Sequence, residues 1–200
     1  MDETTPTSIR VDYSFSTTRA NLLSPFLAII PMVLLSGLYV AVWGVDPVQV
    51  ALFQVYGGSI EAQIGFLVAT VLALILASGA HELIHGAVWV LSTGKPFASA
   101  VELSIDWKAL MPYTFCKELV TVSAYRVGIA MPGIILGILP SLAAVVIGNF
   151  WILTFGLIMV LGAGGDMMIL CKLYGVDAAK LAQDHPSRVG CFVIENETPP

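Results

Sequence analysis

Long apolar runs with almost no charge are the feature that most constrains how this chain can fold. Three such runs occupy residues 20–45, 62–94 and 127–165, and Glu82 is the only formally charged residue within them. A helix that crosses a bilayer needs about 20 mostly apolar residues. The third run is long enough for two crossings, with a turn at Gly148-Asn149. We therefore predict four transmembrane helices, at about 25–43, 64–93, 127–147 and 150–174.

Composition excludes several classes of protein. Only 12% of the residues are charged and 57% are hydrophobic, whereas soluble domains have about 25% charged residues. The length of 200 residues suits one domain. The net charge of -5, with no basic stripe, gives no reason to expect a nucleic-acid partner. The three cysteines lack CxxC spacing, so we expect free thiols rather than disulfides.

The Lys and Arg residues predict how the chain lies in the lipid bilayer. All nine precede the first predicted helix, lie between the second and the third, or lie in the last turn of the fourth or beyond it. Because Lys and Arg are enriched in cytoplasmic loops, we expect a multi-pass protein of the plasma membrane with both termini in the cytosol. The predicted parts are a cytosolic segment 1–24 without a cleavable signal peptide, a membrane domain 25–175 and a cytosolic tail 176–200.

The cytosolic loop 95–126 has the pattern of a short β-hairpin. Apolar and polar residues alternate within Phe97–Ile105, which is typical of a strand, and Ala109–Cys116 can return beside it. Pro112 restricts the returning strand to an edge. The tail 176–200 has the composition of a polar loop. The predicted fold is therefore an all-α integral membrane protein of four transmembrane helices with one short cytosolic hairpin-like loop.

The second predicted helix contains an HExxH motif, His81-Glu82-Leu83-Ile84-His85. Residues four apart lie on one face of a helix, so the two imidazoles can bind one zinc ion. Glu82 is then placed to act as general base toward a metal-bound water. A charged side chain at the centre of a bilayer costs roughly 2.5–3.5 kcal/mol on insertion scales. This cost favours a functional metal site over a chance occurrence of the motif.

Asp166 is the third zinc ligand that we expect. It is the only other acidic residue inside a predicted span, and glycines precede it, which lets a neighbouring helix approach closely. His85 lies nine residues before Gly94, and Asp166 lies nine residues before Gly175. If both glycines end their helices, the two side chains lie at the same depth. The alternative is an ion pair with Lys172, but a spacing of six residues puts that side chain on another face.

These motifs resemble those of known intramembrane enzymes. HELIH in one span, followed by an aspartate two spans later, resembles the site-2 protease family of intramembrane zinc metalloproteases. The chain is more closely similar to small membrane proteins described as putative zincin peptidases. That similarity covers about residues 64–191 and rests on HELIHG at 81–86, PYTFCKE at 112–118, YRVGIAMPGIILGILP at 125–140, GGD at 164–166 and DHPSRVGC at 184–191.

The resemblance implies a function and a set of site residues. Zinc would be held by His81, His85 and Asp166, with Glu82 as the base, and the reaction would be hydrolysis of a peptide bond in a membrane-embedded or membrane-surface polypeptide. Site-2 proteases usually have Gly after the aspartate, where this chain has Met167. They also carry a buried Asn in the middle span, for which this chain has no counterpart. The group that stabilises the oxyanion is therefore not identified.

Two non-enzymatic alternatives stay open. The same residues could bind a divalent metal in a transporter or sensor, although transport has no need for a carboxylate directly after the first histidine. Transporters also often contain paired repeats, and the sequence shows none. The other alternative is an inactive scaffold that binds membrane segments, against which the intact HExxH motif argues. The sequence leaves the substrate-binding residues, the substrate and the oligomeric state undetermined.

Overall fold

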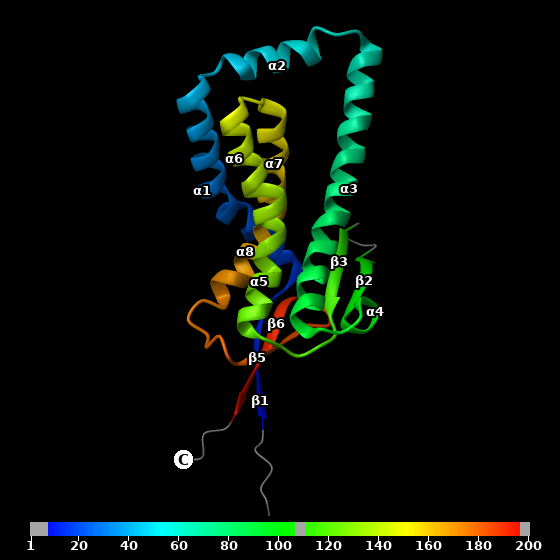
Figure 1. Cartoon of the computed structure of the whole chain (residues 1–200), viewed down its shortest axis with the longest axis vertical. Helices are drawn as coiled ribbons and strands as arrows, with labels where there is room; N and C mark the ends of the chain where they lie inside the picture. The colour runs from blue at the N-terminus through cyan, green and yellow to red at the C-terminus, as the bar shows by residue number, and fades with distance from the viewer. Residues whose placement is uncertain (1–7, 107–110, 197–200) are drawn as a thin grey trace, which may run out of the picture.

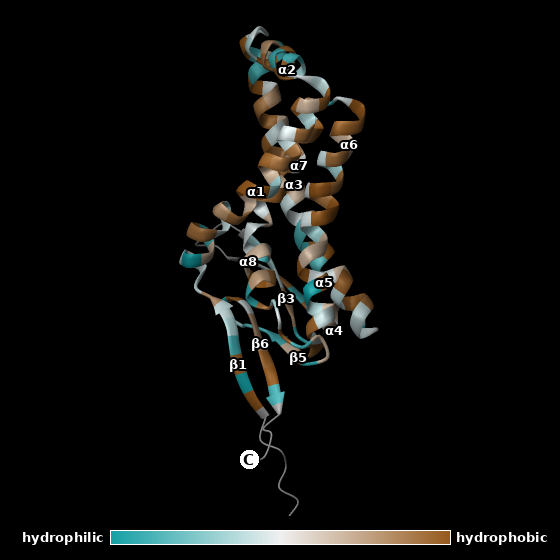
Figure 2. Cartoon of the chain, turned by 90° about the vertical axis from the view of Figure 1, so that its left-hand side faces the viewer, coloured by the Kyte–Doolittle hydropathy of each residue, from teal (hydrophilic) through white to brown (hydrophobic). Residues whose placement is uncertain are grey.

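The computed structural model describes residues 8–106 and 111–196 as a helical bundle above two small β-sheets. The two sheets and both ends of the described chain lie at one end of the molecule, and a short helix crosses the opposite end (Figure 1). Hydrophobic residues cover the long helices, whereas hydrophilic and hydrophobic residues alternate along the first strand (Figure 2). Every described Lys and Arg belongs to an element or loop at the end that holds the sheets.

The first half of the chain forms two long helices joined by a short one. They are α1 (Thr17–Trp43), α2 (Asp46–Tyr56) and α3 (Ile60–Thr93). Ser16 caps α1 by accepting from the Arg19 backbone N–H, so this helix begins before the expected residue 25. Gly94, at φ 65°, ends α3 as the sequence predicts. The connection between the first two spans is helical over α2, which the sequence did not indicate.

The third predicted helix is present and has an irregular centre. It consists of α5 (Val122–Pro132), the π-helical turn η1 (Gly133–Ile138) and α6 (Leu139–Ile147). The π-helical turn follows Pro132 directly. Proline removes a backbone donor from the helix, and wider turns are one way of accommodating that loss. Gly148, at φ 73°, then ends α6 and begins the turn into the next helix.

The fourth predicted helix is wrong in detail, because it is broken. α7 (Phe150–Gly162) and α8 (Gly164–Lys172) meet at an angle of 45° instead of forming one helix over 150–174. The break lies where α1 comes closest, since a Cβ on Gly164 would lie 2.7 Å from the backbone oxygen of Ser24. Three helical segments are long and apolar enough to cross a membrane, and the bent pair makes a fourth if it is one span. This arrangement suits a multi-pass membrane protein.

The expected hairpin is present between α3 and α5. It consists of β2 (Val101–Asp106) and β3 (Met111–Cys116), which pair antiparallel with Val101 opposite Cys116. The expected strand over Phe97–Ile105 is wrong at its start, because Phe97–Ala100 forms the short helix α4 after Pro96. The backbone N–H groups of Ser99 and Ala100 bond to the Pro96 carbonyl, which satisfies this turn locally. Residues 107–110, which join the two strands, lie outside the described residues.

A four-stranded sheet corrects the all-α prediction and the interpretation of the tail as a polar loop. Its antiparallel order is β1-β6-β5-β4, with β1 (Ser8–Phe15), β4 (Val120–Thr121), β5 (Leu181–Asp184) and β6 (Val189–Asn196). Alternate residues of β5 and β6, including Ala182 and Val193, are buried in a core shared with α3, α5 and α8. The two tails therefore fold because each supplies the other with a paired strand, from opposite ends of the chain.

Candidate metal centre

The two histidines of the HExxH motif lie one turn apart on the C-terminal half of α3. His81 is 9% exposed and His85 is 5% exposed, and their ring centroids are 4.9 Å apart. By contrast, none of residues 60–76 in the same helix is buried. The motif therefore occupies the part of α3 that packs against α5 and the hairpin.

Asp166 of α8 meets both histidines. Its Oδ2 lies 3.1 Å from His81 Nε2, and its Oδ1 lies 3.6 Å from His85 Nε2. In the described part of the chain these three residues form a group whose ligand atoms all lie within 4.8 Å of one another. The structure thus brings together the three residues that the sequence predicts as ligands.

The spacing and the chemistry of these donors fit a zinc ion. Tetrahedral zinc with bonds of about 2.0–2.2 Å keeps its ligand atoms about 3.3 Å apart. The distances from the carboxylate to the imidazoles, 3.1 Å from Oδ2 to His81 and 3.6 Å from Oδ1 to His85, are close to that value. Two imidazoles and one carboxylate also leave one of four coordination positions free. Three protein ligands with an open position are typical of catalytic rather than structural zinc.

The bend between α7 and α8 places Asp166 in the first turn of α8. The N-terminus of a helix carries partial positive charge, which favours a carboxylate there. The other end of α8 is held by Arg126 of α5, whose guanidinium donates to the carbonyls of Leu173 and Val176. Lys172 does not pair with Asp166 but donates to the Ser14 carbonyl at 2.7 Å. α8 is therefore fixed to α5 and to β1 independently of the three clustered side chains.

Glu82 lies between the two histidines in sequence and next to the hairpin in space. The hydroxyl of Thr114 in β3 donates to the Glu82 carbonyl at 2.8 Å. Gly86 lets Phe97 of α4 pack closely against α3, because a Cβ at Gly86 would lie 3.1 Å from the Phe97 ring. Sequence analysis did not identify Thr114 or Phe97. The glycine directly after the second histidine was the only local signal that another element packs closely.

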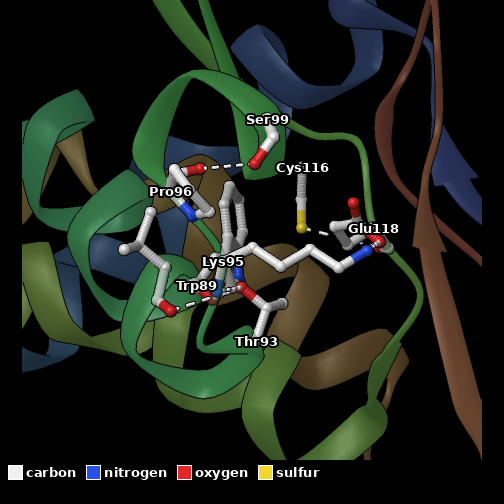
Figure 3. A network of polar contacts seen from close by, with 8 residues as sticks. Trp89, Thr93, Lys95, Pro96, Ser99, Cys116 and Glu118 are labelled. Carbon is white, nitrogen blue, oxygen red and sulfur yellow. Dashed lines mark hydrogen bonds and ion pairs between the residues drawn. The ribbon is translucent and has the colours of Figure 1, made fainter.

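A polar network fixes the hairpin to the end of α3 (Figure 3). Lys95, directly after the helix, pairs with Glu118 at 2.6 Å, and the Cys116 thiol lies 3.6 Å from the Glu118 carbonyl. Within α3, Thr93 donates to the Trp89 carbonyl at 2.9 Å. These contacts close the base of the hairpin against the C-terminal end of α3.

Asp184 joins the hairpin to the terminal sheet and to α5. Its carboxylate accepts from the Cys116 backbone N–H at 3.0 Å and from the Tyr125 hydroxyl at 2.8 Å. Burial raises the pKa of Asp184 to about 7, against the hydrogen bonds, which lower it. Burial also raises the pKa of the Cys116 thiol to about 11 and that of Cys191 to about 12. All three cysteines are free, as expected.

Comparison with known proteins gives one match. A family model described as "Putative zincin peptidase" matches residues 72–180, which is more than half of the chain. The matched range contains the HExxH motif, the hairpin, α5 and Asp166. No curated protein and no solved structure matches the chain.

Proposed function

Because this chain belongs to the putative zincin peptidase family, we propose that it is a zinc-dependent intramembrane metallopeptidase. Its substrate would be a membrane-embedded or membrane-surface polypeptide. The observation that carries the proposal is the convergence of His81, His85 and Asp166 from two apolar helices on one point. Ionisable side chains in such helices raise the free energy of insertion into a bilayer, so three of them at one point indicate a function.

The three clustered residues would hold the zinc ion, and Glu82 would move the proton. A zinc ion held by such ligands would polarise the carbonyl of the substrate and lower the pKa of a bound water toward neutral pH. Glu82 would accept a proton from the attacking water and deliver it to the amine that leaves as the peptide bond breaks. The Thr114 contact holds the backbone of Glu82 and thereby limits where its carboxylate can reach.

The hairpin supplies a way to present an extended substrate. A peptide bond in a helix is shielded by its neighbours, so the substrate must unwind before it is cut. In the described part of the chain β2 and β3 pair only with each other, which leaves each with an outer edge. An unwound segment could add to such an edge as a further strand. β3 lies directly beside the HExxH turn, so a strand added there would run close to Glu82.

The order of the elements supports a site-2-protease-like arrangement. The motif is on α3, the aspartate is on α8, and α5 of the intervening span packs against both helices. The basic residues at the end that holds the sheets support a cytosolic location for that end and for both termini. We therefore propose a plasma-membrane enzyme with its metal centre nearer the cytosolic face.

The test separates metal binding from proton transfer. The purified full chain is assayed for zinc content and for cleavage of labelled casein and of single-span peptides in liposomes. Glu82→Gln should keep zinc and lose at least 100-fold in rate, which is the range attributed to a general base. His85→Ala should lose both, and chelation of zinc should inhibit the wild type reversibly. Glu61→Gln, at the opposite end of the same helix, is the matched control and should change neither.

Two outcomes would contradict the proposal. Cleavage by Glu82→Gln at the wild-type rate would remove the base from the mechanism. Zinc uptake into liposomes that depends on His85 but is unaffected by Glu82→Gln, without any peptide cleavage, would favour a transporter instead.

A further inference from the structure

The ring of His85 contacts the intervening span as well as the other two candidate ligands, His81 and Asp166. Its Nδ1 lies 2.8 Å from the carbonyl oxygen of Gly128 in α5. A carbonyl can only accept, so Nδ1 must carry the hydrogen. In the neutral ring the free lone pair is then on Nε2, the atom that faces Asp166. The backbone of α5 therefore selects the form of His85 that can bind a metal through Nε2.

The same ring is covered by a column of stacked aromatic side chains. His85 and Trp89 stack with centroids 5.6 Å apart and planes at 16°. Trp89 stacks in turn on Tyr125, at 5.7 Å and 13°. Trp89 and Tyr125 are each only 1% exposed. Because Tyr125 also donates to Asp184, the column ends in a hydrogen bond to the terminal sheet.

Burial of the Trp89 indole between His85 and Tyr125 is energetically unfavourable in one respect. Its Nε1 is buried and has no hydrogen-bond partner in the described part of the chain. An unpaired buried donor is unfavourable, so hydrogen bonding does not explain why an indole is here. Its flat face, which covers the histidine ring, is the property that the structure uses.

Gly128 links the carbonyl contact and the stack. A Cβ at this position would lie 2.1 Å from Trp89 Nε1 and 2.7 Å from Cδ1. Any larger residue would therefore displace the indole or move α5 away from α3. Either movement would disturb the orientation of His85, through the stack or through the lost carbonyl contact.

We propose that Gly128 and Trp89 are positioning residues that orient His85 Nε2 toward the metal without contacting it. The inference rests on the proposed role of His85 as a ligand and adds two residues from outside the cluster. Hydrogen-bond partners that orient a metal-binding histidine typically change metal affinity by about 10–100-fold when they are altered. We expect a change of that size when the carbonyl and the stack are disturbed together.

The experiment measures zinc affinity and the protonated nitrogen of the histidines. Zinc affinity is determined by competition with a chromophoric chelator. The ring nitrogens are assigned by NMR of metal-free protein labelled with ¹⁵N-histidine, which is simple because the chain has three histidines. Gly128→Ala should bind zinc about 10–100-fold more weakly and lose the pure Nδ1–H form of His85. Trp89→Phe should weaken binding less than Trp89→Leu, because it retains an aromatic face.

Gly137→Ala is the matched control for crowding. It lies in the same span, nine residues after Gly128, and a Cβ there would lie 2.8 Å from Val160 of α7 instead of meeting Trp89. It should lower the melting temperature and leave zinc affinity unchanged. If Gly128→Ala behaves like Gly137→Ala, with unchanged affinity and unchanged His85 signals, the proposal is wrong. If Gly128→Ala does not fold, the comparison of Trp89→Leu with Trp89→Phe decides.

The design also separates this inference from the proposed function. The NMR measurement on metal-free protein tests the orientation of His85 whether or not the chain cuts peptides. A wild type that binds zinc tightly but cleaves nothing would contradict the peptidase assignment and leave the positioning role supported. A His85 that shows the Nε2–H form in the wild type would overturn the positioning role alone.

Discussion

Replacing Asp184 with asparagine should make the protein less sensitive to rising pH. The folded state raises the pKa of this carboxyl from its ordinary value of 3.8 to about 7, mainly by burial. In the unfolded chain the group releases its proton near pH 4, whereas in the folded protein it holds the proton until about pH 7. Stability therefore falls as the pH rises from about 4 to 7, and the loss is complete above that range.

The size of the effect follows from the same values. At 1.36 kcal/mol per pKa unit, a change from 3.8 to about 7 corresponds to at most about 4 kcal/mol. For a chain of this length that is a fall in melting temperature of about 10 °C. In Asp184→Asn the side-chain amide oxygen would still accept from the Cys116 N–H, and the amide nitrogen could donate to the Tyr125 oxygen. The substitution should therefore keep both contacts while removing the charge.

The assay is thermal unfolding of the full chain in detergent between about pH 4 and pH 8, followed by circular dichroism. The wild type should lose stability across this range relative to Asp184→Asn. Asp12→Asn is the control, because a hydrogen bond from Ser14 lowers the pKa of that carboxyl below its ordinary value of 3.8. The stabilising contribution of its ionised form is lost only as the pH falls below about 4, so Asp12→Asn should leave the shape of the profile between about pH 4 and pH 8 unchanged. Identical pH profiles for the wild type and Asp184→Asn would show that folding does not raise the pKa of Asp184.

Two further predictions concern contacts that position the site. Arg126→Ala removes the donors to the Leu173 and Val176 carbonyls, so it should destabilise the fold by about 2–4 kcal/mol and weaken zinc binding through movement of α8. Arg126→Lys should restore part of the stability and part of the zinc affinity. Stability is measured as the melting temperature, and zinc affinity by competition with a chelator. Thr114→Val removes one hydroxyl at constant shape and should cost about 1 kcal/mol of stability, with a higher KM at nearly unchanged zinc affinity. Thr114→Ser should recover the wild-type KM, and equal KM values for all three forms would exclude the hairpin contact from substrate binding.

The sequence predicts the long apolar helices well, because the signal is local. Uncharged apolar runs of sufficient length have few alternatives to a spanning helix, and Gly94 and Gly148 end helices where their conformational freedom indicates. The hairpin is also confirmed, since its alternating pattern and its turn lie within one short loop. The break before α8 was missed, and at this break Gly164 packs closely against Ser24, a residue of the first helix that is distant in sequence.

The terminal sheet shows the limit of local reasoning. β1 and β6 are short, partly polar and separated by most of the chain. A strand of this kind is stable only when its partner and its core are present. Neither segment carries a pattern that identifies the other, so the C-terminal tail has the composition of a polar loop until it is packed against α3, α5 and α8.

The donors of the candidate metal centre can be identified from the amino-acid sequence. Two histidines four residues apart must share a face of a helix, and an aspartate in an apolar span needs a partner. How these donors are held follows from the packing of the helices against one another. The carbonyl of Gly128, the indole of Trp89 and the guanidinium of Arg126 act through contacts between helices that are distant in sequence. Such contacts depend on close approach in space, and the residue types themselves carry no sign of it.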